Sequence, residues 1–278
     1  MSKEAMLPTE KGREIFYRIW SPAKKAKAAV VIAHGYAEHS GRYEHVAARL
    51  NTAGYVVYAC DYQGHGKTPG KRAHIESPKV LFHDTKSIID LVHQNEGPQL
   101  PIFLLGHSMG SWMGVNFAAE HQGMLKGLIL SGAGVKLTDI SPSQERQINL
   151  GARLSSGKMM TAEFDASRLS HDQGVVDAYK ADPLIFAGTA SLSLLKTMID
   201  MLNKEQEKAK TLKLPILLQK GGDDKIVHGH QELFDSFTGV ADKTLKVYDG
   251  FYHEVYNETP DRRKVVLDDL VAWLDKHV

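Results

Sequence analysis

The 278-residue sequence predicts an α/β fold in which a mostly parallel central sheet is covered by helices on both faces. Two observations support this prediction. Short apolar runs rich in β-branched residues alternate with segments of helical periodicity. The apolar runs, such as residues 28–33, show no polar alternation, which is typical of strands buried on both faces of a parallel sheet.

The predicted elements follow one another regularly through the first half of the chain. Residues 13–20 alternate polar and apolar side chains, which indicates an edge strand with one exposed face. A helix with apolar spacing from Tyr43 to Leu50 ends at Gly54, a residue typical of helix C-caps. The other elements predicted here are buried strands at residues 28–33, 55–60, 102–105 and 127–131, and helices at residues 77–95 and after Ser108.

The alternation of strand and helix stops after Gly134. It resumes with a strand at residues 214–219, followed by a strand at residues 244–248 and a final helix. The stretch between is polar and helical and shows no clear strand. We therefore expect residues 1–134 and 212–278 to form one core domain, and residues 135–211 to form an inserted helical cap or lid.

Two apolar segments stand out in the expected cap. The apolar side chains of residues 192–202 fall on one helical face, which favours packing against the core over exposure to lipid. Residues 148–160 combine apolar side chains with two glycines, which suits an adaptable, mobile surface over a site. We expect Leu150, Leu154 and Met159 of this segment to contact substrate.

Composition and charge exclude several classes of protein. The 34 basic and 33 acidic residues nearly cancel and no basic tract occurs, so no nucleic-acid partner is expected. The single cysteine, Cys60, excludes an intramolecular disulfide and a cysteine-ligated metal cluster. The first residues lack the apolar core of a signal peptide and no run of about 18 apolar residues occurs, so a cytoplasmic protein is predicted.

The strand at residues 102–105 leads into Gly106-His107-Ser108-Met109-Gly110, a G-x-S-x-G motif. Such a motif places its serine in a strained bend between strand and helix, where the two glycines leave room for neighbouring backbone. The serine then lies at the positive end of the following helix, which favours developing negative charge. Ser108 is therefore the predicted nucleophile.

A serine nucleophile requires a histidine base and a carboxylate that orients the histidine. The last two predicted strands lead to such groups, the first to Asp223 and Asp224 and the second to His253. The chain order Ser, Asp, His is that of a hydrolase sheet fold, so His253 is the predicted base and one of the two aspartates is the acid. Because His228-Gly229-His230 has no third ligand at a suitable spacing, no metal is expected, and the motifs call for no other cofactor.

Backbone N–H groups are predicted to bind the oxyanion that forms during acyl transfer. One belongs to Met109, directly after the nucleophile, and the other to Tyr36, in the loop after strand 28–33. The glycine-containing loop at residues 61–66 is interpreted as a turn that supports the site without taking part in the chemistry.

These motifs resemble the monoacylglycerol lipase and lysophospholipase branch of the α/β-hydrolases along nearly the whole chain. Residues 34–39 (HGYAEH) are similar to its H-G-x-G-E-H loop, and residues 61–66 (DYQGHG) are similar to its D-x-x-G-H-G loop. In the expected cap, residues 169–172 (LSHD) and 175–184 (VVDAYKADPL) are similar to its L-S-R-D and V-V-x-A-Y-x-x-D-P-L segments.

The resemblance implies an α/β-hydrolase fold with a helical cap inserted after the sixth strand. It also implies that Asp224 is the acid, since the branch carries its triad carboxylate in a strand-G-x-x-D arrangement. Two departures occur near the site: Ala37 replaces a loop glycine, and Lys67-Thr68 replace a serine after the D-x-x-G-H-G loop.

The predicted activity is hydrolysis of single-acyl-chain lipid esters, either monoacylglycerols or lysophospholipids, by a serine carboxylester hydrolase through an acyl-enzyme. Three alternatives remain open: a broad short-chain carboxylesterase, a serine aminopeptidase on the same scaffold, and a non-catalytic ligand receptor. The expected partner is a small acyl ester or lipid, with transient contact of the cap with a membrane surface. The sequence leaves the headgroup, the acyl-chain length and the oligomeric state open.

Overall fold

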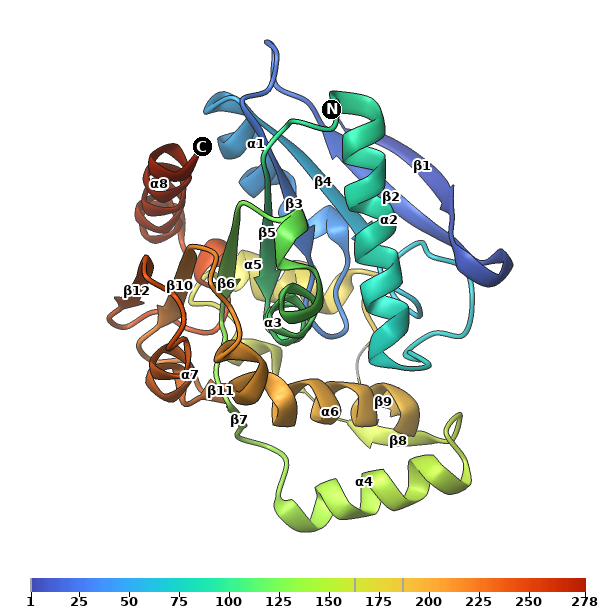
Figure 1. Cartoon of the computed structure of the whole chain (residues 1–278). Helices are drawn as coiled ribbons and strands as arrows, with labels where there is room; N and C mark the ends of the chain where they lie inside the picture. The colour runs from blue at the N-terminus through green and yellow to red at the C-terminus, as the bar shows by residue number, and fades with distance from the viewer. Residues whose placement is uncertain (1, 163, 187) are drawn as a thin grey trace.

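The computed structural model describes residues 2–162, 164–186 and 188–278, and its centre is an eight-stranded sheet with the order β1-β2-β4-β3-β5-β6-β10-β12 (Figure 1). β1 and β2 pair antiparallel, and the six strands from β4 to β12 are parallel, which confirms the predicted mostly parallel sheet. The strands are β1 (Lys3–Pro8), β2 (Glu14–Trp20), β3 (Ala28–Ala33), β4 (Tyr55–Asp61), β5 (Ile102–His107), β6 (Gly127–Ser131), β10 (Ile216–Gly221) and β12 (Lys243–Tyr248).

Helices cover both faces of the sheet, as predicted. On one face, α1 (Glu44–Thr52) and α8 (Pro260–His277) bury side chains such as Leu50 and Trp273. On the other face, α2 (Pro78–Glu96), α3 (Met109–His121) and α7 (His230–Ser236) contribute side chains such as Trp112 and Phe117 to a second core. Short 3-10 helices lie at Glu10–Gly12, Ser40–Tyr43, Gln122–Met124, Ala166–Arg168 and Val255–Asn257.

Residues 135–211, which we call the cap, lie between β6 and β10 in the chain, and none of their described strands joins the eight-stranded sheet. The cap contains α4 (Pro142–Leu154), α5 (Gln173–Ala181) and α6 (Leu192–Ala209). α6 packs on α3 and buries Leu195, Met198 and Ile199, while α4 lies outermost, at the bottom of Figure 1.

Several short strands that were not expected from the sequence occur in the structure. Within the cap, β8 (Met159–Ala162) pairs antiparallel with β9 (Gly188–Ser191). β7 (Lys136–Leu137), also in the cap, pairs antiparallel with β11 (Val227–His228), which lies after β10 in the core. The expectation of a cap without strands was therefore wrong, because strands of two to four residues are too short to show a period of two. β1 was also not predicted.

The parallel strands bring their carboxyl ends to one edge of the sheet, where ligands bind in open α/β folds. β3, β5, β6 and β10 are neighbours in the sheet, so the loops that follow them meet at this edge, which faces the cap (Figure 1). No helix within the described parts of the chain is long and apolar enough to cross a membrane.

Candidate active site

Ser108 occupies the bend between β5 and α3, with φ 52° and ψ −118°. This left-handed backbone is costly for a residue with a side chain and persists only where the surroundings enforce it. A Cβ on Gly106 would lie 2.3 Å from the Gly110 carbonyl oxygen, and one on Gly110 would lie 2.1 Å from the Ala33 carbonyl oxygen. Both glycines are therefore required by close backbone packing, and the predicted sharp bend is present.

His253 and Asp224 form a buried hydrogen-bonded pair in which His253 Nδ1 lies 2.7 Å from Asp224 Oδ2. The backbone N–H groups of Ile226 and Val227 donate to the other carboxylate oxygen, Oδ1, at 2.8 and 3.1 Å. Burial raises the pKa of Asp224, but the charge and hydrogen bonds of His253 and Lys220 outweigh it and hold this pKa well below its usual range.

Asp223 and Asp224, which the sequence motifs left as alternatives for the acid, differ in their surroundings. Asp224 is buried and faces His253, whereas the side chain of Asp223 is exposed to solvent. The backbone N–H of Asp223 donates to the Phe251 carbonyl oxygen at 2.9 Å, which fixes its peptide within the turn. The geometry therefore agrees with the acid that the family resemblance implied.

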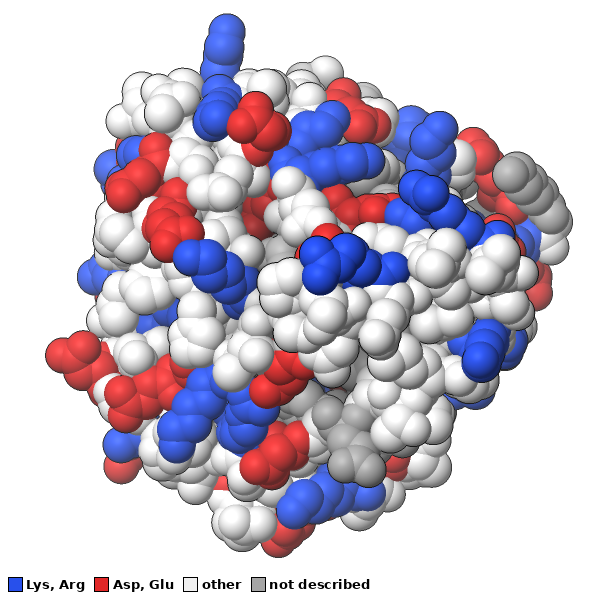
Figure 2. All heavy atoms as spheres, turned by 90° about the horizontal axis from the view of Figure 1, so that it is seen from below, with Lys and Arg blue, Asp and Glu red and all other residues white. Residues whose placement is uncertain are grey.

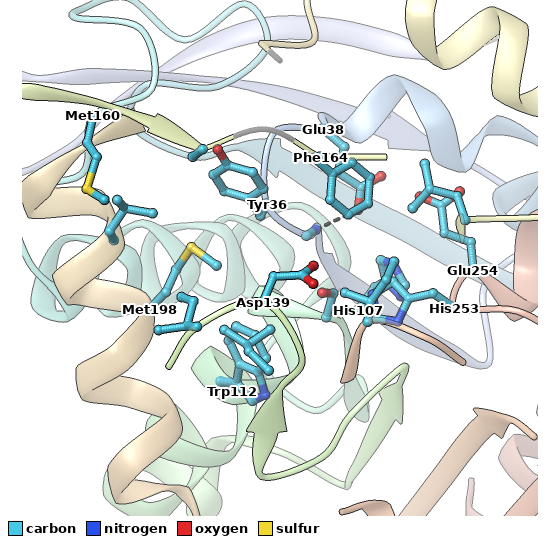
Figure 3. A pocket seen from close by; sticks show the side chains of 18 of the residues that line it. Tyr36, Glu38, His107, Trp112, Asp139, Met160, Phe164, Met198, His253 and Glu254 are labelled. Carbon is cyan, nitrogen blue, oxygen red and sulfur yellow. Dashed lines mark hydrogen bonds between the residues drawn. The ribbon is translucent and has the colours of Figure 1, made fainter. Parts of the chain in front are cut away.

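Ser108, His253 and Tyr36 line the same cavity. Figure 3 shows Tyr36 and His253 among its lining residues. Within the described residues, no hydrogen bond joins the Ser108 hydroxyl to His253; catalytic hydrogen bonds are often long in free enzymes and shorten with substrate. Gly132, with φ 60°, packs so closely that a Cβ would lie 2.9 Å from His253 Cε1. The position of the imidazole ring therefore depends on a glycine at residue 132.

The loop after β3 approaches Ser108 closely. A Cβ on Gly35 would lie 3.3 Å from Ser108 Cβ, and the Gly35 N–H donates to Glu38 Oε1 at 2.6 Å. Tyr36 lines the cavity, and Met109 is buried at the first turn of α3. Ala37 stands where the similar H-G-x-G-E-H loop has its second glycine. Its backbone has φ 64°, a conformation that glycine adopts more readily.

A buried ionic network lies beside the histidine and was not predicted from the sequence. Arg42 donates to Glu38 Oε2 at 2.8 Å and to both carboxylate oxygens of Glu254 at 2.6 and 2.7 Å. His107 packs on His253 with ring centroids 5.0 Å apart, and burial lowers the pKa of His107 to about 4. The available signal was an acidic residue next to His253 in the sequence.

The cavity is polar at one end and apolar at the other. In Figure 3, His107, His253 and Glu254 lie at one end, and Met160 and Met198 lie at the other. Further apolar lining residues come from α3, the cap and the turn after β10, and include Trp112, Leu137, Ile148, Phe164, Leu195 and Ile226.

The three cap residues expected to contact substrate do not line this cavity. Leu150, Leu154 and Met159 are 61%, 81% and 39% exposed. Their neighbours Ile148 and Met160 line the cavity instead. In α4, the inward face carries Ile148, so Leu150 and Leu154 point outward, and in β8 successive side chains alternate between the two faces.

Among the residues that the structure describes, no three His, Cys, Asp or Glu side chains are grouped in a way that could hold a metal ion. His228 is exposed, and burial lowers the pKa of the partly buried His230.

Comparison with known proteins gives matches along nearly the whole chain. A family described as "Serine aminopeptidase, S33" matches residues 24–260. The "Monoacylglycerol lipase" of Mycolicibacterium smegmatis is 37% identical over 270 residues, which cover 96% of this chain and 95% of that protein. The "Monoglyceride lipase" of Homo sapiens is 30% identical, with 95% of this chain and 88% of that protein covered. The crystal structure of Paleococcus ferrophilus monoacylglycerol lipase is 30% identical with a TM-score of 0.86, over 95% of this chain and 99% of that chain.

Proposed function

The chain belongs to the serine aminopeptidase, S33 family, and we propose that it hydrolyses the ester bond of monoacylglycerols. It is a serine carboxylester hydrolase with the α/β-hydrolase fold. The observation that carries the proposal is one cavity that joins Ser108 and His253 to a wall of apolar side chains. Such a wall suits an acyl chain, because burial of each methylene group contributes about 0.8 kcal/mol.

In the proposed mechanism, Ser108 Oγ attacks the ester carbonyl carbon while His253 accepts the hydroxyl proton. The tetrahedral intermediate collapses when His253 gives that proton to the glycerol oxygen, which leaves as the alcohol. A water molecule, deprotonated by the same histidine, then releases the fatty acid and restores Ser108. The Asp224 carboxylate accepts a hydrogen bond from His253 Nδ1, which orients the imidazole and stabilises the imidazolium formed at each step.

The backbone N–H groups of Tyr36 and Met109 are proposed to bind the oxyanion of the intermediate. The close approach of Gly35 to Ser108 supports the position of the first donor. Met109 begins α3, so the positive end of the helix adds to the second donor. Loss of one such donor typically raises the barrier by about 3 kcal/mol.

The charges around the cavity favour a neutral alcohol over a charged headgroup. The three carboxylates that line it are each paired with an arginine, Glu38 and Glu254 with Arg42, and Asp139 with Arg168. No lysine or arginine occurs among the described lining residues. Neither a phosphate group nor a free amino terminus finds an unpaired counter-charge there, so glycerol esters fit better than lysophospholipids or peptides.

We further propose that α4 contacts the lipid surface that carries the substrate. Leu150 and Leu154 project from its outer face, where Arg146 and Arg153 are also exposed. Figure 2, seen from the side where α4 lies outermost, shows a broad area without charged side chains, bordered by lysines, arginines and acidic residues. Exposed apolar side chains flanked by cations are typical of a helix at a membrane interface. A cytoplasmic location stays a prediction.

The test is a comparison of kcat/KM for monooleoylglycerol, oleoyl lysophosphatidylcholine, p-nitrophenyl butyrate and an aminoacyl p-nitroanilide, with wild type and Ser108→Ala. We expect monooleoylglycerol to be the best substrate and the variant to be inactive with all four. A preference for the lysophospholipid, the butyrate ester or the anilide would replace the proposal with the corresponding alternative. Failure of a fluorophosphonate probe to label Ser108 in the wild type would instead indicate a receptor.

A further inference from the structure

Lys220 is a buried lysine next to the proposed acid of the site. It is the fifth residue of β10, one residue before the strand ends, and it is only 2% exposed. Its ammonium group donates to Asp224 Oδ2 and to the carbonyl oxygen of Val227. Transfer of an ammonium group from water into a protein interior costs several kcal/mol, so its pairing with Asp224 strongly affects both groups.

Lys220 and His253 share one oxygen of Asp224. His253 Nδ1 lies 2.7 Å from Oδ2, the atom that also accepts from Lys220 Nζ. The second oxygen, Oδ1, is occupied by the N–H groups of Ile226 and Val227. The carboxylate therefore accepts from four donors. Its single negative charge interacts both with the ammonium group of Lys220 and with the imidazolium that forms on His253 during the reaction.

Lys220 also holds the turn that presents the acid. The Val227 peptide donates its N–H to Asp224 Oδ1, and the Val227 carbonyl accepts from Lys220. One side chain thus contacts both the carboxylate and the backbone that orients it. Burial lowers the pKa of Lys220, and the charge and hydrogen bond of Asp224 oppose that effect.

Other charged and titratable groups surround this pair from the neighbouring elements. His230 of α7 is close enough to interact with both Lys220 and Asp224. His107 at the end of β5 packs on His253, and the network of Glu38, Arg42 and Glu254 lies beyond it. A substitution of Lys220 alone leaves all of these side chains in the sequence, so the variant and the wild type differ in one charged group.

We propose that Lys220 is a positioning residue that fixes Asp224. By offsetting the negative charge of Asp224, Lys220 keeps the hydrolytic site in its proton-accepting form to a lower pH than the same Ser-His-Asp site would reach without the lysine. This inference rests on the proposed function of Ser108, His253 and Asp224. An uncompensated Asp224 carboxylate stabilises the His253 imidazolium more strongly, so that the base is lost at higher pH. With Lys220 present, part of that stabilisation is cancelled.

The test is the pH dependence of fluorophosphonate labelling of Ser108 in Lys220→Met and Lys220→Gln. Both changes remove the charge at similar length, and the glutamine keeps a donor for Asp224. We expect the midpoint of the acid limb to rise by on the order of one pH unit in both variants. The matched control is Lys225→Gln, which removes an exposed lysine one residue after Asp224 and is expected to leave the midpoint nearly unchanged.

A midpoint that is unchanged or lower in a folded Lys220 variant would overturn the inference and leave Lys220 with a purely structural role. If one variant fails to fold, as judged by circular dichroism, the other decides the result. The proton on His253 Nδ1, followed by NMR across the same pH range, gives a readout that needs no turnover. A wild-type protein that is not labelled at Ser108 would contradict the proposed function itself, whereas labelling with no shift in the variants would contradict this inference alone.

Discussion

Arg42 and Glu254 form a buried bidentate ion pair that joins two loops of the candidate site, with N–O distances of 2.6 and 2.7 Å. Arg42 also binds Glu38, and Glu254 directly follows His253. Burial would raise the pKa of Glu38, but the charge of Arg42, together with His107, His34 and the N–H of Gly35, outweighs it and lowers this pKa to about 2. One guanidinium group therefore fixes the loop of Tyr36 relative to the loop of His253.

Arg42→Met is expected to destabilise the protein by about 3–5 kcal/mol, because two buried carboxylates lose their counter-ion. The measurement is the free energy of unfolding in urea. Arg49→Met is the control, since Arg49 pairs with Asp268 at the surface, where such pairs contribute less than about 1 kcal/mol. Equal decreases in the free energy of unfolding in the two variants would show that the buried ion pairs of Arg42 stabilise the protein no more than a surface pair does.

Asp224→Asn is expected to lower kcat by on the order of 10⁴, because the amide favours the wrong tautomer of His253. Asp223→Asn is expected to have little effect, since that side chain is exposed and does not contact the histidine. Steady-state kinetics on p-nitrophenyl esters, with circular dichroism as a folding check, measure both. Similar losses in the two variants would contradict the assignment of the acid.

Much of the fold could be predicted because its signals are local. Buried β-branched runs, turn glycines and the spacing around Ser108 are readable within a few residues. Strand β1 was missed because its pairing with β2, rather than its own pattern, makes it a strand. In α4, apolar residues occur on both faces, so only packing against the rest of the molecule decides that Ile148 lines the cavity while Leu154 does not.

The three residues of the proposed triad could be predicted for the same reason, whereas the ion pairs beside them could not. Ser108, Asp224 and His253 each follow a strand that the sequence marks clearly. Arg42 and Glu254 are separated by 212 positions, and no local pattern links them. Lys220 lies in a buried strand, where charged residues are unusual. Its position there was the one signal in the sequence that it has a buried partner.

Gly132→Ala is expected to lower kcat by about 100-fold with little change in overall fold. The added Cβ would lie 2.9 Å from His253 Cε1, and the backbone at residue 132 has φ 60°, so the imidazole ring must move. Gly123→Ala is the control, because nothing lies within 4 Å of its Cβ position. Normal activity in Gly132→Ala would show that His253 does not depend on this contact.

Ile148→Asp and Leu154→Asp place the same charge on opposite faces of α4. The Ile148 variant is expected to lower kcat/KM for p-nitrophenyl laurate at least about tenfold and for the butyrate far less, because the charge enters the apolar end of the cavity. The Leu154 variant is expected to keep both values and to bind lipid vesicles about tenfold more weakly. Reversed results for the two positions would contradict the placement of the acyl chain.

Glu205 gives a prediction about stability and pH. It lies in α6, is fully buried, and neither carboxylate oxygen has a hydrogen-bond partner among the described residues. Burial raises the pKa of Glu205 well above its ordinary value of 4.5. As pH rises above that value, the unfolded state releases the proton while the folded state retains it, so the folded state loses stability until its own raised pKa is reached.

Glu205→Gln removes this titration while keeping the shape of the side chain. Wild type and variant are expected to have similar free energies of unfolding near pH 4, and the variant is expected to be more stable at pH 8 by on the order of 2 kcal/mol. Urea unfolding at the two pH values measures the difference, with Glu207→Gln as an exposed control on the same helix. A difference that does not grow with pH would show that burial does not raise the pKa of Glu205 above its ordinary value.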